Sequence, residues 1–139
     1  MSARTKARKR AVDALFAADL RDGMPNELLD EAERASEDRV SQGEIFSYAR
    51  EAVLGVLQHQ VEIDDQLETY AQGWSLNRMP ALDRAILRLA TWEIMFNDQV
   101  PDAVAIDEAV ELAKEYSTDN SAGFVNGLLG KIVSTRTAL

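Results

Sequence analysis

Residues 80–97, which read PALDRAILRLATWEIMFN, decide the fold of this chain. When this segment is drawn as a helix, apolar side chains fall on nearly every side of it. A helix that is apolar all round is normally buried at the centre of a protein. Pro80 suits the first turn of such a helix, and Asn97 begins the polar stretch that ends it before Pro101. We therefore expect a helical protein built around residues 80–97.

Helical periodicity continues towards the N-terminus, where alternation typical of strands is scarce. We expect helices over roughly residues 4–21 and 26–37. Ser41 and Glu44 have the spacing of a capping box, which predicts the start of a further helix at this point. That helical pattern has a predicted break near residues 59–62 and ends at Gly73, and residues 74–79 form a connector.

Two more helices are predicted after Pro101, with apolar stripes that include Ile106 and Val125. In the second of these, Gly127 and Gly130 are interpreted as points of close helix packing, and the tail from residue 134 is expected to fray. The predicted fold class is all-α, with six or seven helices in two packed small helical bundles divided near residues 73–79.

Length and composition favour one compact domain that spans residues 1–139, because 46% of the residues are apolar and the chain can bury a core. There is no cysteine, which excludes disulfides and thiolate metal sites. No apolar run approaches the roughly 20 residues of a membrane helix, and no apolar segment follows the basic N-terminus as in a secretory signal. We expect a cytoplasmic protein without a metal or cofactor; an organelle-targeting peptide is the alternative interpretation of the N-terminus.

The net charge of −9 argues against polyanion binding by the whole surface. Residues 1–10 nevertheless carry five basic side chains and no acidic one, so the other 129 residues carry 10 basic and 24 acidic ones. This N-terminal basic arm indicates a local polyanion site, in which cations at an exposed helix end contact phosphates. A disordered, solubilising tail is the alternative. The arm residues are Arg4, Lys6, Arg8, Lys9 and Arg10.

A second candidate site lies at the start of the last predicted helix. Asn120 or Ser121 is expected to cap this helix, and free backbone amides there would favour a phosphate. Phe124 lies at the edge of the apolar stripe in the first turn. It would either stack on an unpaired base or pack in the core, and its position alone favours the core.

Signals of catalysis are nearly absent. The chain has one histidine, His59, and no arrangement with the spacing of a nucleophile, base and orienting acid can be proposed. The carboxylates of Asp64 and Asp65, and those of Asp107, Glu108 and Glu111, are interpreted as solvated helix faces rather than cation sites. The glycines form no phosphate-binding loop. We expect a binding protein and not an enzyme.

Several blocks of the chain, in this order and spacing, resemble the NusB family. The first is the basic helix at residues 7–16 (ARKRAVDALF), which looks like the arginine-rich N-terminal helix of the family. The others are residues 82–88 (LDRAILR), 92–93 (WE), 100–101 (VP), 105–114 (AIDEAVELAK) and 124–129 (FVNGLL). The resemblance covers essentially the whole chain, although the acidic segment 22–40 matches poorly.

The resemblance implies an all-helical protein of two small bundles that acts in transcription antitermination. Members pair with NusE, a protein of the small ribosomal subunit. The pair binds the boxA element of ribosomal RNA operon transcripts and helps assemble an antitermination complex on RNA polymerase. Carried over by position, the arm would hold the RNA backbone. Asn120, Ser121 and Phe124 would contact bases or phosphates; many relatives have an acid where Asn120 stands, and a neutral amide should repel phosphate less. Asp83, and less strongly Trp74 and Arg84, are candidates for the NusE surface.

Three other functions are alternatives to transcription antitermination. The main alternative is a helical protein–protein adaptor without RNA binding, which suits the acidic faces but not the basic arm. An RNA methyltransferase with a NusB-like domain would need room for a cofactor-binding fold. DNA binding through the basic helix would lack a paired recognition helix. Apolar surface that NusE would cover could also support a homodimer.

Overall fold

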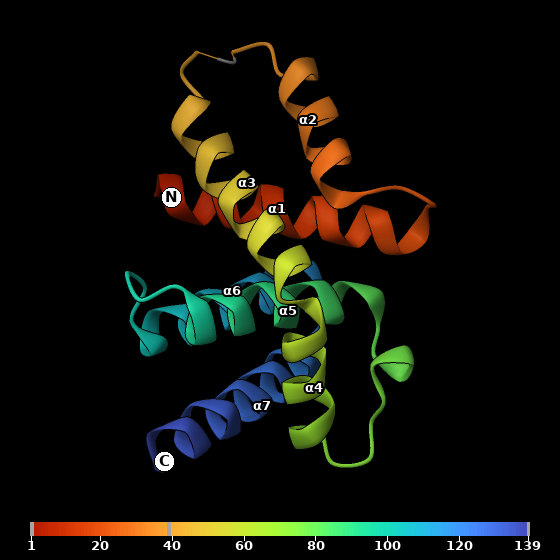
Figure 1. Cartoon of the computed structure of the whole chain (residues 1–139), viewed down its shortest axis with the longest axis vertical. Coiled ribbons are helices and arrows are strands. Elements are labelled where there is room, and N and C mark those ends of the chain that lie inside the picture. Colours follow the sequence, from red (N-terminus) through yellow and green to blue (C-terminus); the bar gives the residue numbers. More distant parts are fainter. Residues whose placement is uncertain (1, 39, 139) are drawn as a thin grey trace.

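The computed structural model describes residues 2–38 and 40–138, and these residues form seven α-helices, one short 3-10 helix and no strand. The predicted all-α fold with six or seven helices is therefore confirmed. Figure 1 shows α1, α2 and α3 at one end of the molecule and α4 and α7 at the other, with α5 and α6 between them. No helix in this described part of the chain is both long and apolar enough to cross a membrane. The helices are α1 (Ala3–Leu20), α2 (Pro25–Ala35), α3 (Gly43–Gln58), α4 (Gln60–Tyr70), the 3-10 helix η1 (Leu76–Arg78), α5 (Ala81–Phe96), α6 (Asp102–Tyr116) and α7 (Asp119–Ala138).

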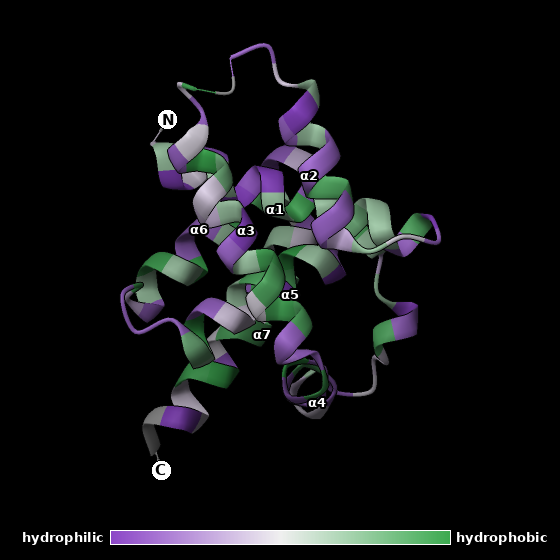
Figure 2. Ribbon diagram, turned by 45° about the horizontal axis from the view of Figure 1, so that its top comes forward, coloured by the Kyte–Doolittle hydropathy of each residue, from purple (hydrophilic) through white to green (hydrophobic). Residues whose placement is uncertain are grey.

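Helix α5 is the centre of the fold, as its apolar pattern predicts. It packs against α1, α3, α4, α6 and α7. Figure 2 shows it as a hydrophobic helix among helices with hydrophilic outer faces. Burying a large aliphatic side chain stabilises the fold by about 1.5–3 kcal/mol, so the apolar sides of α5 dominate the core. Its buried apolar residues are Ala85, Ile86, Leu87, Leu89, Ala90, Trp92 and Ile94.

Two local predictions are wrong. The capping box at Ser41 does not form: the Ser41 hydroxyl donates to the backbone carbonyl of Asp38 at 3.3 Å, and α3 begins only at Gly43 without a side-chain cap. The tail from residue 134 is not frayed, because α7 continues to residue 138. The predicted break near residues 59–62 is confirmed, since His59 separates α3 from α4. The chain leaves α4 through Gln72 and Gly73, both with positive φ, which glycine adopts readily.

Ion pairs join α5 to the helices on either side. The Arg84 Nε lies 3.0 Å from the Asp19 carboxylate of α1, and the Arg88 guanidinium contacts Asp64 of α4 through both nitrogens, at 2.9 and 3.0 Å. Arg84 also donates to the backbone carbonyls of Leu76 and Met79, at 2.7 and 3.2 Å. These bonds hold the connector between α4 and α5 against α1.

Among the glycines, it is Gly55 of α3 that allows a close helix approach, and not those of the last helix. A Cβ atom at Gly55 would overlap the indole ring of Trp92 in α5. At Gly127 and Gly130, by contrast, an added Cβ would meet no atom within 4 Å. The prediction that these two glycines permit close packing is therefore wrong, because their Cα atoms face open space.

We expect Gly55→Ala to destabilise the protein by about 1–3 kcal/mol, since the rigid indole cannot move aside without disturbing the core. Gly130→Ala is the matched control. It should stabilise the protein by up to about 1 kcal/mol, because alanine favours a helix interior over glycine. Urea unfolding followed by circular dichroism measures both. Equal stability of the two variants would show that α3 and α5 are not in the close contact described.

A buried polar network crosses the core between α1, α3 and α5. Arg8 and Glu93 are only 3% and 1% exposed, and the Arg8 Nε donates to both Glu93 carboxylate oxygens, at 3.1 and 3.0 Å. The Tyr48 hydroxyl also donates to Glu93 and accepts from the Asn97 amide at 3.1 Å. A second guanidinium nitrogen of Arg8 lies 3.4 Å from Glu108 of α6. One arginine of α1 thus contacts acidic side chains on both α5 and α6.

Burial raises the pKa of the Glu93 carboxyl, and the Arg8 charge and the hydrogen bonds from Tyr48 and Arg8 oppose that rise. Burial, together with the Glu93 charge, raises the pKa of the Tyr48 phenol well above its ordinary value. Tyr48 therefore stays protonated and acts as a hydrogen-bond donor to Glu93. Because each polar group of the network satisfies another, removal of any one would leave a buried group unpaired.

We expect Arg8→Met to cost about 3–5 kcal/mol of unfolding free energy, because it leaves the Glu93 carboxylate buried without its cation. The double variant Arg8→Met/Glu93→Gln should recover part of that loss, since the buried charge is then gone. Chemical denaturation of both variants tests this. A loss below about 1 kcal/mol for the single variant would mean that Arg8 is not locked in this network.

Candidate nucleic-acid interface

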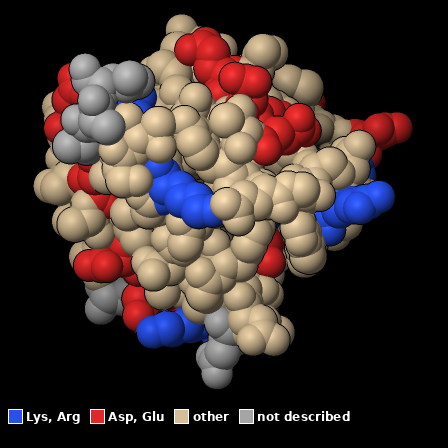
Figure 3. Space-filling view, turned by 90° about the horizontal axis from the view of Figure 1, so that it is seen from below, with Lys and Arg blue, Asp and Glu red and all other residues tan. Residues whose placement is uncertain are grey.

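Positive charge is confined to a few places on this acidic protein. Figure 3 shows one end of the molecule, on which Lys and Arg appear in separated groups between larger uncharged areas, and acidic side chains appear near the top and along the left edge. A nucleic acid needs a run of cations that matches its phosphates. The basic residues of α1 are therefore the first candidates.

The basic arm is helical and not a disordered tail. Helix α1 begins at Ala3, and the Ser2 hydroxyl caps it by accepting a hydrogen bond from the Thr5 backbone amide at 3.1 Å. The hydroxyl of Thr5 donates to Glu108 of α6 at 2.8 Å, which ties the first turn to the body of the protein. The arm therefore presents its side chains in fixed directions.

Four of the five arm residues reach solvent or the pocket beside α1, and one does not. Arg4 is exposed and its guanidinium lies 3.8 Å from the centre of the Tyr48 ring. Arg8 is the exception, because it is buried in the network with Glu93. The expectation that Arg8 stands exposed with the other arm residues is therefore wrong.

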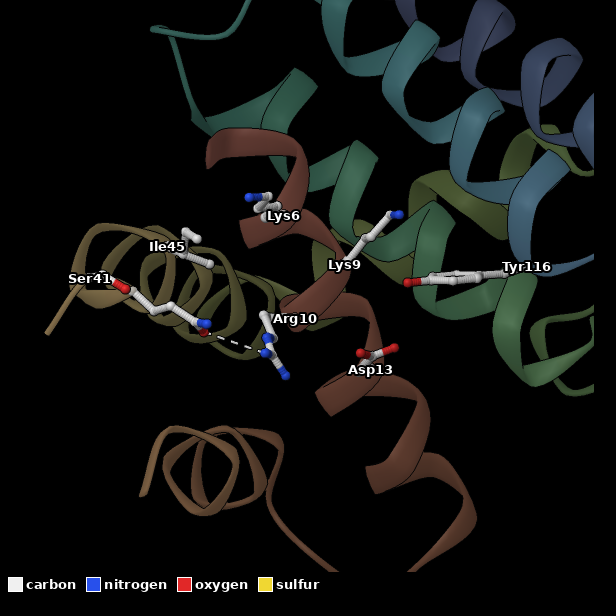
Figure 4. Close-up of a pocket in the computed structure, with 8 residues that line it drawn as sticks. Lys6, Lys9, Arg10, Asp13, Ser41, Ile45 and Tyr116 are labelled. Carbon is white, nitrogen blue, oxygen red and sulfur yellow. Dashed lines mark hydrogen bonds between the residues drawn. The ribbon is translucent and has the colours of Figure 1, made fainter. Parts of the chain in front are cut away.

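Lys6, Lys9 and Arg10 line one pocket, which we call the basic pocket. Its volume is about 470 Å³, and Figure 4 shows the three cations on the side of α1 that faces the start of α3 and the end of α6, with Lys9 extending towards Tyr116 and Arg10 away from it. Pockets of roughly 300–1,000 Å³ accept small ligands or parts of larger ones. The other lining residues are Asp13, Ser41, Gln42, Ile45 and Tyr116.

The cations of the basic pocket keep part of their charge free for a ligand. Lys9 forms an ion pair with Glu115 at 2.7 Å, and this hydrogen bond raises the pKa of Lys9. Arg10 donates only a long hydrogen bond of 3.5 Å to the Gln42 amide oxygen, and Lys6 forms no ion pair with any described residue. Exposed pairs such as Lys9–Glu115 are weak, so a phosphate group could compete for Lys9.

The last helix begins earlier than predicted. The Thr118 hydroxyl accepts a hydrogen bond from the Ser121 amide at 3.1 Å, which is the geometry of a helix cap, and α7 begins at residue 119. The prediction that Asn120 or Ser121 provides the cap is wrong. Both lie inside the first turn. The Ser121 hydroxyl is engaged with Ser117 at 2.9 Å and donates to Asp83 at 2.9 Å.

A second hollow, which we call the aromatic pocket, lies beside this first turn. Its volume is about 260 Å³. Phe124 is partly buried and packs against the core, yet part of its ring faces the pocket, where it lies 5.7 Å from the centre of the Trp74 ring. Trp74 is 50% exposed. The two rings supply surfaces on which a base would stack. The lining residues are Trp74, Pro80, Asp83, Asn120, Ser121 and Phe124.

The three residues predicted for a protein partner have different surroundings. Trp74 offers open surface. The Arg84 side chain is only 16% exposed and already binds Asp19. Asp83 is 3% exposed; one of its carboxylate oxygens accepts from Ser121, and the other is buried without a partner. The expectation that Asp83 lies on an open partner surface is therefore wrong, because α7 covers it.

Sequence reasoning missed the other five lining residues of the basic pocket, among them Asp13, Gln42 and Tyr116. Asp13 follows Lys9 and Arg10 by four and three positions, so helical spacing alone places it beside them. Tyr116 and Gln42 come from distant segments and carry no such signal. Their position depends on how α3 and α6 pack against α1.

The comparisons with known proteins agree with this architecture. The NusB family model matches residues 5–134. A transcription antitermination protein NusB of Leifsonia xyli subsp. xyli is 61% identical over 137 residues, which cover 98% of this chain and 94% of that protein.

Solved structures agree as well. The NusB of T. maritima has a TM-score of 0.83 at 37% identity and covers 94% of this chain and 90% of its own. A structure of the antitermination factors NusB and NusE with double-stranded RNA contains a chain with a TM-score of 0.82 at 29% identity, covering 97% and 98%. With a family model matched over nearly its whole length and a relative of this identity, the chain belongs to the NusB family.

Proposed function

We propose that this chain is a transcription antitermination factor that binds boxA RNA of ribosomal RNA operon transcripts together with NusE. The pair would help to assemble an antitermination complex on RNA polymerase in the cytoplasm. The protein acts by binding and not by catalysis. The observation that carries the proposal is the basic pocket, which three cations of α1 line on a protein of net charge −9.

The basic pocket supports contact with the RNA backbone. Lys6, Lys9 and Arg10 provide cations for phosphates, and Arg4 extends the charged face towards Tyr48. Phosphate contacts of this kind fix the register of a bound strand and depend on salt. Arg8 is left out of the RNA contacts, because its guanidinium is committed to Glu93.

The aromatic pocket supports contact with a base. A splayed base would stack on Phe124 or Trp74, while Asn120 offers an exposed amide. Only the turn between α6 and α7 separates Tyr116 of the basic pocket from this hollow, and the Ser117–Ser121 hydrogen bond bridges it. A single strand that crossed the turn would occupy both pockets.

Exposed apolar side chains and the negative body support a protein partner that is basic. Trp74 is the partner-binding candidate that we retain, because its ring is half exposed. Opposite charge would speed the encounter with NusE. RNA held by both proteins would raise the overall affinity without a new contact within either pair.

The first test is a fluorescence-anisotropy titration of labelled boxA RNA against a scrambled RNA, with and without NusE. We expect tighter binding to boxA that NusE strengthens. Lys9→Ala/Arg10→Ala should weaken binding about tenfold or more. It should also reduce the slope of log affinity against log salt by about 1.4, which is about 0.7 for each lost phosphate contact on single-stranded RNA.

The matched control removes the same charge elsewhere. Arg34→Ala/Arg136→Ala changes two exposed arginines of α2 and α7 and should alter affinity and salt slope much less. Equal losses in the two double variants would point to net charge alone. Equal weak binding to both RNAs, unchanged by NusE, would contradict the proposed function and favour a protein–protein adaptor without RNA binding.

A further inference from the structure

The basic pocket contains one acidic side chain that a site for phosphate alone would not need. Asp13 lines it together with Lys6, Lys9 and Arg10. In the described chain the Asp13 carboxylate has no hydrogen bond and no ion pair, although Lys9 and Arg10 are one turn away on the same helix. Figure 4 shows it on the next turn of α1, beyond Lys9 and Arg10 and on the side of α1 that faces Tyr116. Its two oxygens have no protein partner among the described residues and could accept from a ligand that displaces water.

The surroundings of Asp13 favour a hydrogen-bonding ligand over an anion. The Asp13 side chain is exposed at the rim of the pocket, yet partial burial raises its pKa, and the charges of Arg10 and Lys9 oppose this rise. A carboxylate repels a phosphate placed next to it, and it gains most from N–H donors that replace lost water. A ligand that fits the whole pocket must therefore combine an anionic part with an edge that carries donors.

We propose that the basic pocket binds a guanine nucleotide of the RNA, with Asp13 accepting from the N1–H and N2–H groups of the base and Lys6, Lys9 and Arg10 holding its phosphate. This inference rests on the proposed function, because it names the base that the RNA-binding pocket selects. Asp13 is thereby a specificity-determining residue, while the cations supply the affinity that does not depend on sequence.

Guanine fits because its Watson–Crick edge carries two adjacent donors, which a carboxylate accepts side by side. Adenine and cytosine offer an amino group next to a ring acceptor, and uracil offers one N–H between two carbonyls; each acceptor would face the Asp13 charge. The third group of the guanine edge, O6, needs a donor. Gln42 accepts from Arg10 and Ser36 through its amide oxygen, so its amide N–H groups remain free for O6.

Tyr116 completes the site with an aromatic surface. The ring is partly buried at the end of α6, and the Lys9 ammonium lies 5.8 Å from its centre. Burial and the Asp13 charge raise the pKa of the phenol. A base stacked on such a ring gains affinity whatever its identity. The choice among bases therefore depends on Asp13 and Gln42.

The test compares uridine oligonucleotides that carry one central guanosine, inosine or uridine, titrated by fluorescence anisotropy. Inosine differs from guanosine only by the missing N2 amino group. We expect the native protein to bind the guanosine strand about tenfold more tightly than the inosine strand, because one hydrogen bond to a charged acceptor is lost. In Asp13→Asn this ratio should fall close to one, while affinity for the uridine strand stays equal or rises, since a negative charge has been removed.

Asp65→Asn is the control, because it removes an exposed charge on α4 and should keep the native ratio. Thermal unfolding verifies that Asp13→Asn is folded; an unpaired carboxylate contributes little to stability. The inference is overturned if the native protein does not distinguish guanosine from inosine, or if Asp13→Asn distinguishes them equally well. If Lys9→Ala/Arg10→Ala still weakens binding in that case, only the guanine assignment fails. If that variant binds every strand as the native protein does, the proposed RNA contact itself fails.

Discussion

The buried pair of Arg8 and Glu93 sets the rotation of α1, and the rest of the interface depends on that rotation. Successive residues of a helix are about 100° apart, so residues at positions 6, 10 and 13 lie on the side opposite position 8. When Arg8 turns inward to meet Glu93, Lys6, Arg10 and Asp13 must turn outward into the basic pocket. A buried ion pair adds little net stability compared with an apolar pair, but an unpaired partner is costly, which selects one rotation of the helix.

The same constraint explains how an acidic protein would bind RNA. The chain does not rely on its overall charge, which is negative, but on a local group of cations that one helix holds in a fixed direction. Two carboxylates reduce the positive charge of this group: Glu115 pairs with Lys9, and Asp13 lines the same pocket without an ion pair. Such a site would bind polyanions weakly in general and favour strands whose bases satisfy its donors and acceptors. The aromatic rings across the α6–α7 turn would add affinity for a base.

The sequence was informative where the signal is local. Apolar residues on nearly every side of residues 80–97 predicted a central helix, and α5 is central. The position of Phe124 at the edge of an apolar stripe was compatible with packing and with exposure, and its ring is partly buried and partly exposed. Tertiary partners decided the rest. In the sequence alone, Arg8 looks like its basic neighbours, and only folding brings Glu93, 85 residues away, beside it. Folding likewise places α7 over Asp83. The cap at Thr118 was missed by two or three residues, because several adjacent residues there are all good caps.

Photocrosslinking of boxA RNA that carries photoreactive bases, with the crosslinked residues of the native protein located by mass spectrometry, would show directly whether one strand occupies both pockets. We expect crosslinks on both sides of the α6–α7 turn, at Tyr116 in the basic pocket and at Phe124 or Trp74 in the aromatic pocket. Crosslinks confined to other faces, such as the outer side of α2 or of α4, would contradict it.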